Sequence, residues 1–294
     1  MKNIMVSIPN DPELAGRLGK KGSSNGLTFY NRKADDSVFV IISPTSPETK
    51  FNSVAEVLTI SDDVLISTRN VDRLFGESVI GCSLLSKGIV LTSDNDASAI
   101  MQRSGVRSKV LEEGQILDHF GSAQRDSQGD PVVEIDHSFD VKGVGVILLG
   151  IVRSGTLRAH DELFFGTGKR IGVRSIQSQD QDVKEAGVNT RVGIAIRGAE
   201  SDELSKGYVL SKNEIKRVSK IQAQISVSNV VKEKGLDYKE LWLVCGFRSS
   251  LCKAVSKGGD YELELTAQLQ ISRGERFLLV RKDSPRIFAS GIVK

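Results

Sequence analysis

The stretch VVEIDHSFDVKGVGVILLGIVRSG, residues 132–155, carries the clearest structural signal in the chain. Two runs of β-branched and apolar residues flank a glycine-containing loop at 141–145, which predicts a β-hairpin. Gly143 and Gly145 supply the positive φ angles or the close backbone approach that a tight loop needs. Gly150 lies inside the second run, where glycine often marks a bulge or a barrel corner.

Short apolar segments recur after this hairpin, near 162–165, 169–176, 191–197 and 207–210. Turn-forming residues separate them. Regular short strands with glycine turns are typical of a β-sandwich or a closed barrel. The pattern therefore predicts a small antiparallel β-domain.

Residues 131–213 as a whole resemble the second domain of translational GTPases of the EF-Tu and SelB type. The resemblance runs in register through the hairpin, VRSIQS at 173–178, VGIAIRG at 192–198 and SKGYVL at 205–210. It implies a β-barrel beside a GTP-binding domain, so a domain of that kind is expected upstream.

The C-terminal third, 214–294, also predicts a β-barrel. Apolar and polar residues alternate over 215–231, and YELEL at 261–265 alternates cleanly, as strands with one buried face do. The segments RFLL at 276–279 and RIFASG at 286–291 resemble the third domain of the SelB-like branch, which contacts the tRNA stem in the family.

The N-terminal segment, 1–127, alternates strand patterns with helix patterns. Strands are predicted at 3–8, 27–31, 37–42, 64–66 and 88–91, and helices at 12–20, 48–59, 71–86 and 96–103. Such alternation predicts a parallel α/β sheet. The order resembles a compact translational G domain, particularly that of archaeal SelB-like paralogues. Little chain separates Thr92 from a polar linker at 121–131, so we expect the last strand and helix of a full G domain to be trimmed.

The motifs of GTP chemistry are missing where the resemblance places them. A P-loop needs G-x-x-x-x-G-K-[S/T] directly after the first strand, but the sequence there reads PNDPELAG at 9–16. Gly19–Ser24 follows the first expected helix instead of preceding it. The position of the Mg²⁺-binding aspartate falls on the isoleucines at 41–42, and the guanine-reading position on Asp94 or Asp96 without the Asn and Lys of the motif. We expect a degenerate G domain, no GTPase activity, and no GTP or Mg²⁺ cofactor.

Charge is distributed unevenly along the chain. The formal net charge is −3 over 1–130, 0 over 131–213 and +6 over 214–294. A basic domain suits nucleic acid, because Lys and Arg release counterions from phosphates, although an ordinary solvated surface explains the charge equally well.

Cysteine usage and hydropathy exclude several classes of protein. Cys82, Cys245 and Cys252 form no Cys-x-x-Cys pair, which argues against a disulfide scaffold or a cysteine-rich zinc site. No apolar run reaches the roughly 20 residues of a membrane helix. We expect a cytoplasmic protein with no membrane partner.

By resemblance, the second domain binds the aminoacylated 3′ end of a tRNA, between its first strand and the strand that carries VRSIQ. The matching positions are Asp136, His137, Phe139, Val146, Ile147 and Gln177. Gln177 stands where relatives usually have a glutamate, and its amide can still bond a ribose or a base edge. The residues themselves favour a barrel-core role for Phe139 and leave His137 open between an RNA contact and a plain surface histidine.

Cationic residues of the third domain are the candidates for contact with the tRNA stem, although each of them, taken alone, is more often a solvated side chain. They are Lys253, Lys257, Arg273, Arg276, Arg281 and Lys282. The three histidines match no metal-ligand spacing, and no Ser or Cys lies in a nucleophile elbow. We predict no catalytic residue and no metal site.

Three functions are compatible with these observations. The first is a translation-factor-like protein that binds tRNA or another structured RNA without hydrolysing GTP, with the ribosome as a further partner. The second is a divergent GTPase with an unconventional phosphate loop. The third is a regulator that competes with an active paralogue, with the remnant G domain as an interaction surface.

Overall fold

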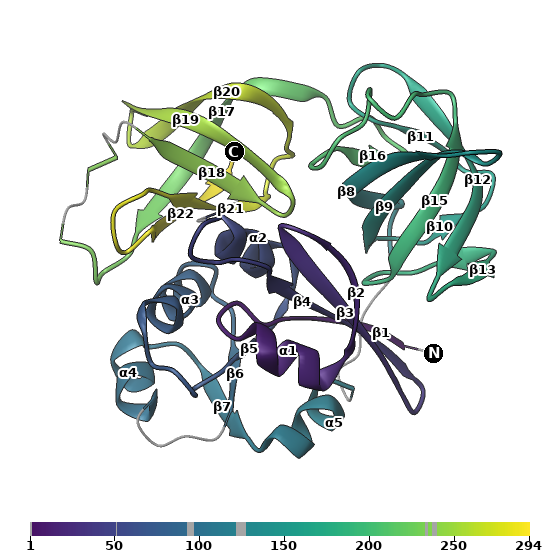
Figure 1. Cartoon of the computed structure of the whole chain (residues 1–294). Coiled ribbons are helices and arrows are strands. Elements are labelled where there is room, and N and C mark those ends of the chain that lie inside the picture. Colours follow the sequence, from purple (N-terminus) through teal and green to yellow (C-terminus); the bar gives the residue numbers. More distant parts are fainter. Residues whose placement is uncertain (1, 51, 93–96, 122–127, 233–234, 237–239) are drawn as a thin grey trace.

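The computed structural model describes residues 2–50, 52–92, 97–121, 128–232, 235–236 and 240–294, with the backbone alone at 98–99 and 102–103. The chain folds into an α/β domain followed by two β-barrels, and the three meet at a common junction (Figure 1). The predicted fold class, a G-like α/β domain followed by β-barrel domains, is confirmed.

The G-like domain is built on a seven-stranded sheet in the order β2-β3-β4-β1-β5-β6-β7. Strands β4, β1, β5, β6 and β7 run parallel, and the β2–β3 hairpin adds two antiparallel strands at one edge. The elements are β1 Lys2–Ser7, α1 Pro12–Leu18, β2 Lys20–Asn25, β3 Leu27–Ala34, β4 Ser37–Pro44, α2 Ser53–Ile60, β5 Asp63–Ile66, α3 Arg73–Leu84, β6 Ile89–Thr92, α4 Ala97–Ser104, β7 Ser108–Leu111, the 3₁₀ helix η1 Glu113–Gln115 and α5 Ile116–Gly121.

Helices cover both faces of this sheet. Helices α1 and α5 share one apolar cluster with β1 and β4, and α2, α3 and α4 share another with β5 and β6. Because both faces are covered, the central strands are apolar throughout, as expected of parallel strands. All eight residues of β4 are buried.

Four elements of this domain escaped the sequence prediction: β2, β7, η1 and α5. Strand β7 and helix α5 occupy the places of the last strand and helix that we expected to be trimmed, so that expectation is wrong. Three of the four residues of β7 are exposed, and all six of β2 are. Neither strand therefore carries an apolar period that a sequence pattern can detect.

The second domain is a closed barrel. The strands β11-β16-β8-β9-β15-β12 follow one another, and a β11–β12 pairing closes the ring. Strand β13 pairs with β12 outside this ring, and β10 and β14 form a separate two-stranded sheet. The predicted hairpin is β8–β9, with positive φ at Gly143 and Gly145. The strands are β8 Val132–Val141, β9 Gly145–Ser154, β10 Leu157–Arg158, β11 Glu162–Phe164, β12 Arg170–Ser178, β13 Gln181–Val183, β14 Glu185–Ala186, β15 Arg191–Arg197 and β16 Val209–Ser211.

The third domain is a closed six-stranded barrel in the order β17-β20-β19-β18-β21-β22. Its interior holds large apolar side chains, among them Phe277 and Phe288, which are fully buried. The strands are β17 Arg217–Val227, β18 Leu241–Cys245, β19 Arg248–Lys257, β20 Asp260–Gln270, β21 Arg276–Val280 and β22 Ile287–Val293.

Within the described ranges, no helix is long and apolar enough to cross a membrane. All three cysteines are free and buried, and burial raises the pKa of each thiol to about 12. None of them is therefore a ready nucleophile at neutral pH.

Candidate nucleic-acid interface

Four neighbouring strands of the second barrel bring predicted site residues into one row. His137 on β8 pairs with Leu149 on β9, Leu149 with Gly193 on β15, and Gly193 with Gln177 on β12. Residues paired in this way project from the same face of a sheet. His137 and Gln177 are exposed, whereas the adjacent Leu148 is fully buried in the barrel. The row therefore lies on the outside of the barrel.

Two neighbouring residues of the predicted pocket, Val146 and Ile147, point to opposite faces of the barrel wall. Phe139 pairs with Ile147 on the outer face, and both are half-buried. Val146 points the other way and is buried in the barrel core, so its assignment to the pocket is wrong. The core role that the residues favoured for Phe139 is wrong too, because its ring lies outside, with its centroid 5.5 Å from that of His137.

A bulge in β8 places Asp136 beside this row. The register between β8 and β9 shifts from Ile135 to His137, opposite Gly150. A Cβ at Gly150 would lie 2.5 Å from the carbonyl oxygen of Glu134, so only glycine permits this close approach. The expectation that Gly150 marks a bulge is confirmed.

Asp136 is buried and paired with Arg191. Both Oδ atoms accept hydrogen bonds from the guanidinium, one of them at 2.8 Å. Arg191 reaches the G-like domain, because its guanidinium carbon lies 3.7 Å from the centre of the Phe29 ring and its Nη2 donates to Ser23 Oγ at 3.1 Å. Asp136 therefore orients Arg191, which bridges the second barrel and the G-like domain, and is not itself an exposed contact residue.

A groove of about 480 Å³ separates the β2–β3 hairpin from the second barrel. On the barrel side, Gln177, Ser178 and Gln179 line it, with Asp180. Gln179 Nε2 donates to Asn31 Oδ1 across the groove at 3.1 Å. The full lining comprises Lys20, Lys21, Gly22, Ser23, Asn31, Arg32, Lys33, Leu149, Gln177, Ser178, Gln179, Asp180, Arg191, Val192 and Gly193.

The hairpin side of the groove carries Lys20, Lys21, Arg32 and Lys33, which are all exposed. Among the residues that the structure describes, none of the four forms an ion pair, and Arg32 donates only a long hydrogen bond, 3.5 Å, to Leu18 O. We call these four residues the cationic wall. Sequence reasoning missed it, and the available signal was the adjacent Lys-Lys and Arg-Lys pairs on either side of Gly26, a turn-forming residue.

Two cations of the third barrel serve structural contacts. Arg281 is buried, with its guanidinium carbon 4.9 Å from the Phe288 ring centre and its Nε donating to Pro285 O at 3.2 Å. Its assignment to the tRNA stem is therefore wrong. Arg276 is exposed, but its Nη1 donates at 2.9 Å to Leu85 O, at the C-terminal end of α3, which ties it to the interface with the G-like domain.

The remaining predicted cations are exposed but partly neutralised. Lys253 lies opposite Glu264 in the β19–β20 ladder, and Lys257 Nζ lies 3.3 Å from Glu262. Opposite charges at such positions attract one another across the ladder. Lys282 Nζ lies 2.5 Å from Glu240. Arg273, in the β20–β21 turn, is exposed.

The loop after β1 lies where a G domain binds phosphate, and its own side chains fill it. Asp11 caps α1, since its Oδ1 accepts from Leu14 N at 2.9 Å. Ser67, after β5, donates to Asp11 Oδ2 at 2.7 Å and exchanges two hydrogen bonds with Asn10. The predicted guanine-reading remnants, Asp94 and Asp96, lie outside the described residues. Within the described ranges, no cluster of three metal-ligating side chains occurs.

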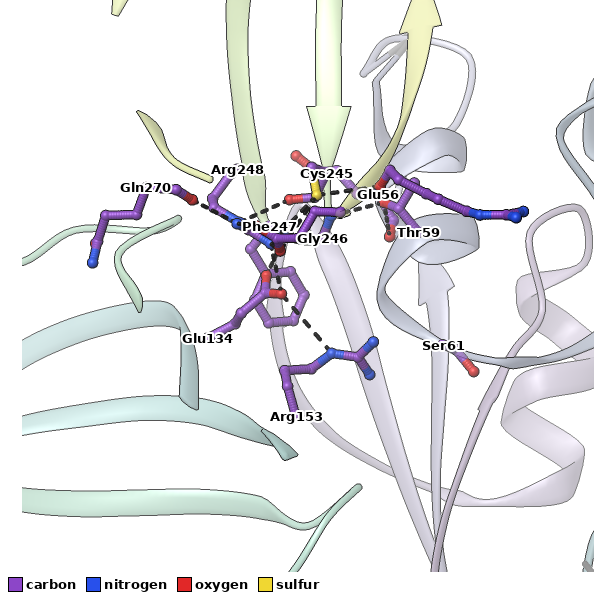
Figure 2. A network of polar contacts seen from close by, with 12 residues as sticks. Glu56, Thr59, Ser61, Glu134, Arg153, Cys245, Gly246, Phe247, Arg248 and Gln270 are labelled. Atoms are coloured by element: carbon purple, nitrogen blue, oxygen red, sulfur yellow. Dashed lines mark hydrogen bonds and ion pairs between the residues drawn. The ribbon is translucent and has the colours of Figure 1, made fainter. Parts of the chain in front are cut away.

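The three domains meet at a buried polar network (Figure 2). Arg248 of the third barrel is 3% exposed and lies 3.1 Å from Glu134 of the second barrel and 2.8 Å from Glu275. The turn before it supplies two backbone donors: Phe247 N bonds to Glu134 Oε2 at 3.0 Å, and Gly246 N to Thr59 Oγ1 of α2 at 2.9 Å. This turn therefore fixes all three domains, and with them the two sides of the groove.

Known proteins resemble this chain in sequence and in fold. Residues 145–211 match the family model of elongation factor Tu domain 2. An uncharacterized protein of Methanocaldococcus jannaschii is 29% identical over 95% of this chain and 96% of its own length. The selenocysteine-specific elongation factor of the same organism is 27% identical over 67% of this chain, which spans only 44% of that protein.

A solved structure shares the arrangement of the whole chain. Translation elongation factor SelB from Methanococcus maripaludis covers 100% of this chain in its apo form and in complex with the GTP analogue GppNHp, with TM-scores of 0.77 and 0.78 at 20% and 19% identity. This chain covers 80% and 79% of those structures. At that identity the likeness establishes the fold. Together with the sequence matches, it confirms the predicted relationship of this chain to the EF-Tu/SelB-type translation factor family.

Proposed function

We propose that this protein is a translation-factor-like RNA-binding protein that takes the 3′ end and stem of a tRNA without hydrolysing GTP. The observation that carries the proposal is the outer row of the second barrel, in which the exposed His137 and Gln177 lie on one face with Leu149 between them. Leu149 and Gln177 also line an open groove. Two of the residues predicted for a 3′-end site, His137 and Gln177, lie on this face, which supports the proposal.

The chemistry of the row suits a single-stranded end. The amide of Gln177 both donates and accepts, which matches ribose hydroxyls and base edges. One of its donors is engaged, since Nε2 bonds to Asp182 Oδ1 at 2.9 Å, so the amide is oriented and its remaining atoms face solvent. The ring pair of His137 and Phe139 offers a surface on which an unpaired base can stack.

The absence of GTP hydrolysis is supported by the loop after β1. Phosphate binds at helix N-termini because free N–H groups and the helix dipole attract an anion. Here the Asp11 carboxylate already accepts from the first turn of α1, and its charge repels phosphate. Pro12, in the first turn, has no N–H to offer.

The remaining exposed cations of the third barrel, Lys253, Lys257, Arg273 and Lys282, are the proposed contacts to the stem. Their partial pairing with glutamates implies that each contributes modestly. The ribosome remains a proposed further partner on the strength of the family relationship alone.

Binding of fluorescently labelled tRNA tests the proposal. Aminoacylated, deacylated and 3′-truncated tRNA are titrated over a salt series without nucleotide, and fluorescent GTP is titrated separately with Mg²⁺. We expect tRNA binding that weakens steeply with salt, weakens further when the 3′ end is removed, and needs no GTP. Micromolar GTP binding without tRNA affinity would overturn the proposal in favour of a divergent GTPase.

The barrel face itself is tested by His137→Ala combined with Gln177→Ala. Gln224→Ala is the matched control, since Gln224 is an exposed glutamine on β17 outside the cationic set. We expect the double variant to lose the difference between intact and truncated tRNA, and the control to retain it.

A further inference from the structure

We infer that the cavity at the junction of the three domains binds a small oxyanion of the phosphate class, which is held by one cation from each domain. These cations are Lys87 of the G-like domain, Arg153 on β9 of the second barrel and Arg276 on β21 of the third barrel. The inference is independent of the proposed function, because this cavity shares no lining residue with the groove beside the second barrel.

The size of the cavity suits a small ion. Its volume is about 280 Å³, and residues of all three domains line it. This volume is just below the roughly 300–1,000 Å³ of sites for drug-sized ligands. The charged side chains of the lining are four cations and three carboxylates, so the lining carries an excess of positive charge. A small anion with part of its water shell therefore fits both the volume and the charge.

Two carboxylates of the lining already have hydrogen-bond donors. Glu134 accepts from Arg248 at 3.1 Å and from Phe247 N at 3.0 Å. Glu275 accepts from the same guanidinium at 2.8 and 3.1 Å. The third carboxylate, Asp62, is exposed to solvent. The buried Arg248 thus serves both glutamates, and the acceptors of the cavity wall do not depend on the other three cations.

Arg153 brings donors to the cavity without an acceptor for them. Its side chain is 21% exposed, and its Nε lies 3.9 Å from Glu134 Oε1, which is too far for a hydrogen bond. Figure 2 shows its two terminal nitrogens directed away from Glu134. In the part of the chain that the structure describes, this guanidinium donates no hydrogen bond. Because a guanidinium has only donors, a largely buried one needs an acceptor from outside the protein.

The other two cations keep part of their donor capacity. Arg276 donates through Nη1 to Leu85 O at 2.9 Å, and its Nε and Nη2 form no hydrogen bond with a described residue. Lys87 donates through Nζ to Leu58 O at 2.6 Å and to Ser61 O. An ammonium group has three donors, so one donor of Lys87 is left. Each of the three domains therefore offers free donors to the cavity.

The three cations are close enough to repel one another. Burial lowers the pKa of Lys87 to about 8, mainly through loss of hydration. The charges of Arg153 and Arg276 act in the same direction, whereas Asp62 opposes them. A bound anion removes this repulsion, and its attraction to the cations is stronger in a partly dry cavity than at an exposed surface. It also connects all three domains, so it should stabilise the arrangement in Figure 1.

The chemistry of the donors favours a phosphate-class anion. The forked guanidinium groups match pairs of phosphate oxygens, and a lysine adds a point charge. A phosphate presents oxygens in several directions, as three cations from separate domains require, whereas a carboxylate presents its oxygens in one plane. A metal ion is disfavoured, because the excess charge of the lining repels it.

Isothermal titration calorimetry of the full chain with inorganic phosphate tests the site, without nucleotide and at an ionic strength held constant with chloride. The decisive variants are Arg153→Gln and Arg276→Gln, which remove one cation from each barrel. Arg158→Gln is the matched control, because Arg158 is an exposed arginine of the second barrel that pairs with Glu185 outside the cavity. Circular dichroism verifies the fold of each variant. Arg153→Lys, which keeps the charge, replaces Arg153→Gln if that variant does not fold.

We expect saturable phosphate binding by the wild type, and by the control within about twofold of it, as for a surface change away from the site. Arg153→Gln and Arg276→Gln should each bind at least about tenfold more weakly, because charge-assisted hydrogen bonds are lost. Phosphate should also raise the unfolding midpoint more in the wild type than in these two variants, since a ligand stabilises the state that binds it. Glycerol phosphate identifies the source: binding as tight as that of phosphate supports a phosphomonoester, and weaker binding supports the free ion.

Three outcomes overturn the inference. Equal phosphate affinity in the wild type and in both cavity variants places the anion elsewhere on the protein. No saturable binding, with a midpoint that rises equally in all proteins, shows that water fills the cavity, because phosphate salts also stabilise proteins by exclusion from their surface. Acetate binding as tight as that of phosphate contradicts the phosphate class. The experiment contains no RNA, so none of these results bears on the proposed function.

Discussion

The G-like domain contacts its two barrels in opposite ways. Against the third barrel it is dry: Val244, Leu278 and Ile287 join the apolar cluster of α2 and α3, and Glu77 forms a buried ion pair with Arg286. Against the second barrel, Ile151 joins an apolar cluster with Phe29 and Ile42 and Lys206 pairs with Glu56. The rest of this contact is wet, an open groove bridged by single polar contacts. A dry, ion-paired interface holds a fixed geometry, while a wet groove with unpaired cations leaves room for a ligand.

The largest expected effect is on the dry interface. In Glu77→Ala, Arg286 keeps its burial, 3% exposed, but loses three hydrogen bonds to that carboxylate from its side chain. Removing one partner of a buried pair typically costs about 3–5 kcal/mol. The free energy of unfolding in urea measures the cost. The surface pair of Arg17 with Glu113 is about half exposed, so Arg17→Ala is the control, at less than about 1 kcal/mol. Equal losses in the two variants would show that the buried Glu77–Arg286 pair stabilises the protein no more than an exposed surface pair does.

A smaller loss of stability is expected for Arg191, whose side chain bridges the second barrel and the G-like domain beside the wet groove. Arg191→Ala removes the pairing to Asp136, the stacking on Phe29 and the bond to Ser23, and leaves a carboxylate largely buried. The Arg191 side chain is 11% exposed, so we expect about 2–3 kcal/mol, between surface and fully buried pairs. Hydrogen exchange of β2 should increase, since the hairpin loses a tether. Exchange that rises equally in β21 would show that the two interfaces are not independent.

The free energy of unfolding should also depend on pH, through Lys87 on the side of the G-like domain that faces the domain junction. Burial lowers the pKa of Lys87 from 10.5 to about 8, and its Nζ donates to Leu58 O at 2.6 Å, near the end of α2. Between pH 8 and 10.5 the unfolded chain binds more protons at this site, so stability rises with pH, by at most about 1.4 kcal/mol per unit. The difference between wild type and Lys87→Met, followed by urea unfolding, should show this rise. A difference that is flat or falls over this range contradicts it.

The smallest effect is expected from a single contact on the barrel face. Gln177→Ala removes one oriented amide from a site with several contacts, so tRNA affinity should fall about three- to fivefold, as the loss of one net hydrogen bond of about 1 kcal/mol implies. Stability should not change, because the side chain is exposed. A stability loss comparable to that of Arg191→Ala would assign Gln177 to the structure of the interface.

The net charge of each sequence segment was the least reliable guide to where unpaired cations lie. The third domain carries the +6, yet Lys220 and Lys257 pair with glutamates on β20, and Arg286 is buried on Glu77. The first 130 residues carry −3 but hold the cationic wall. Net charge sums over surfaces that the fold separates, so it does not locate a patch.

Local pattern, in contrast, predicted much of the architecture. The β8–β9 hairpin, its bulge at Gly150 and the alternating strands of both barrels follow from side-chain period and glycine position. The missed elements of the G-like domain, β2, β7, η1 and α5, are short or polar, and β2 and β7 are strands because β3 and β6 pair with them. Such pairing depends on backbone groups of distant residues and leaves no apolar period in the sequence.

The sequence by itself predicted most of the strands and helices, the resemblance to the EF-Tu/SelB-type family and a loop after the first strand that does not match the P-loop pattern, because apolar periods and motif spacings can be read along the chain. Only the tertiary structure decided which cations are free, which of Asp136 and His137 faces solvent, and that Val146 points inward while Ile147 points outward. Those outcomes depend on strand register and on the packing of three domains, where a shift of one residue exchanges the buried and exposed faces.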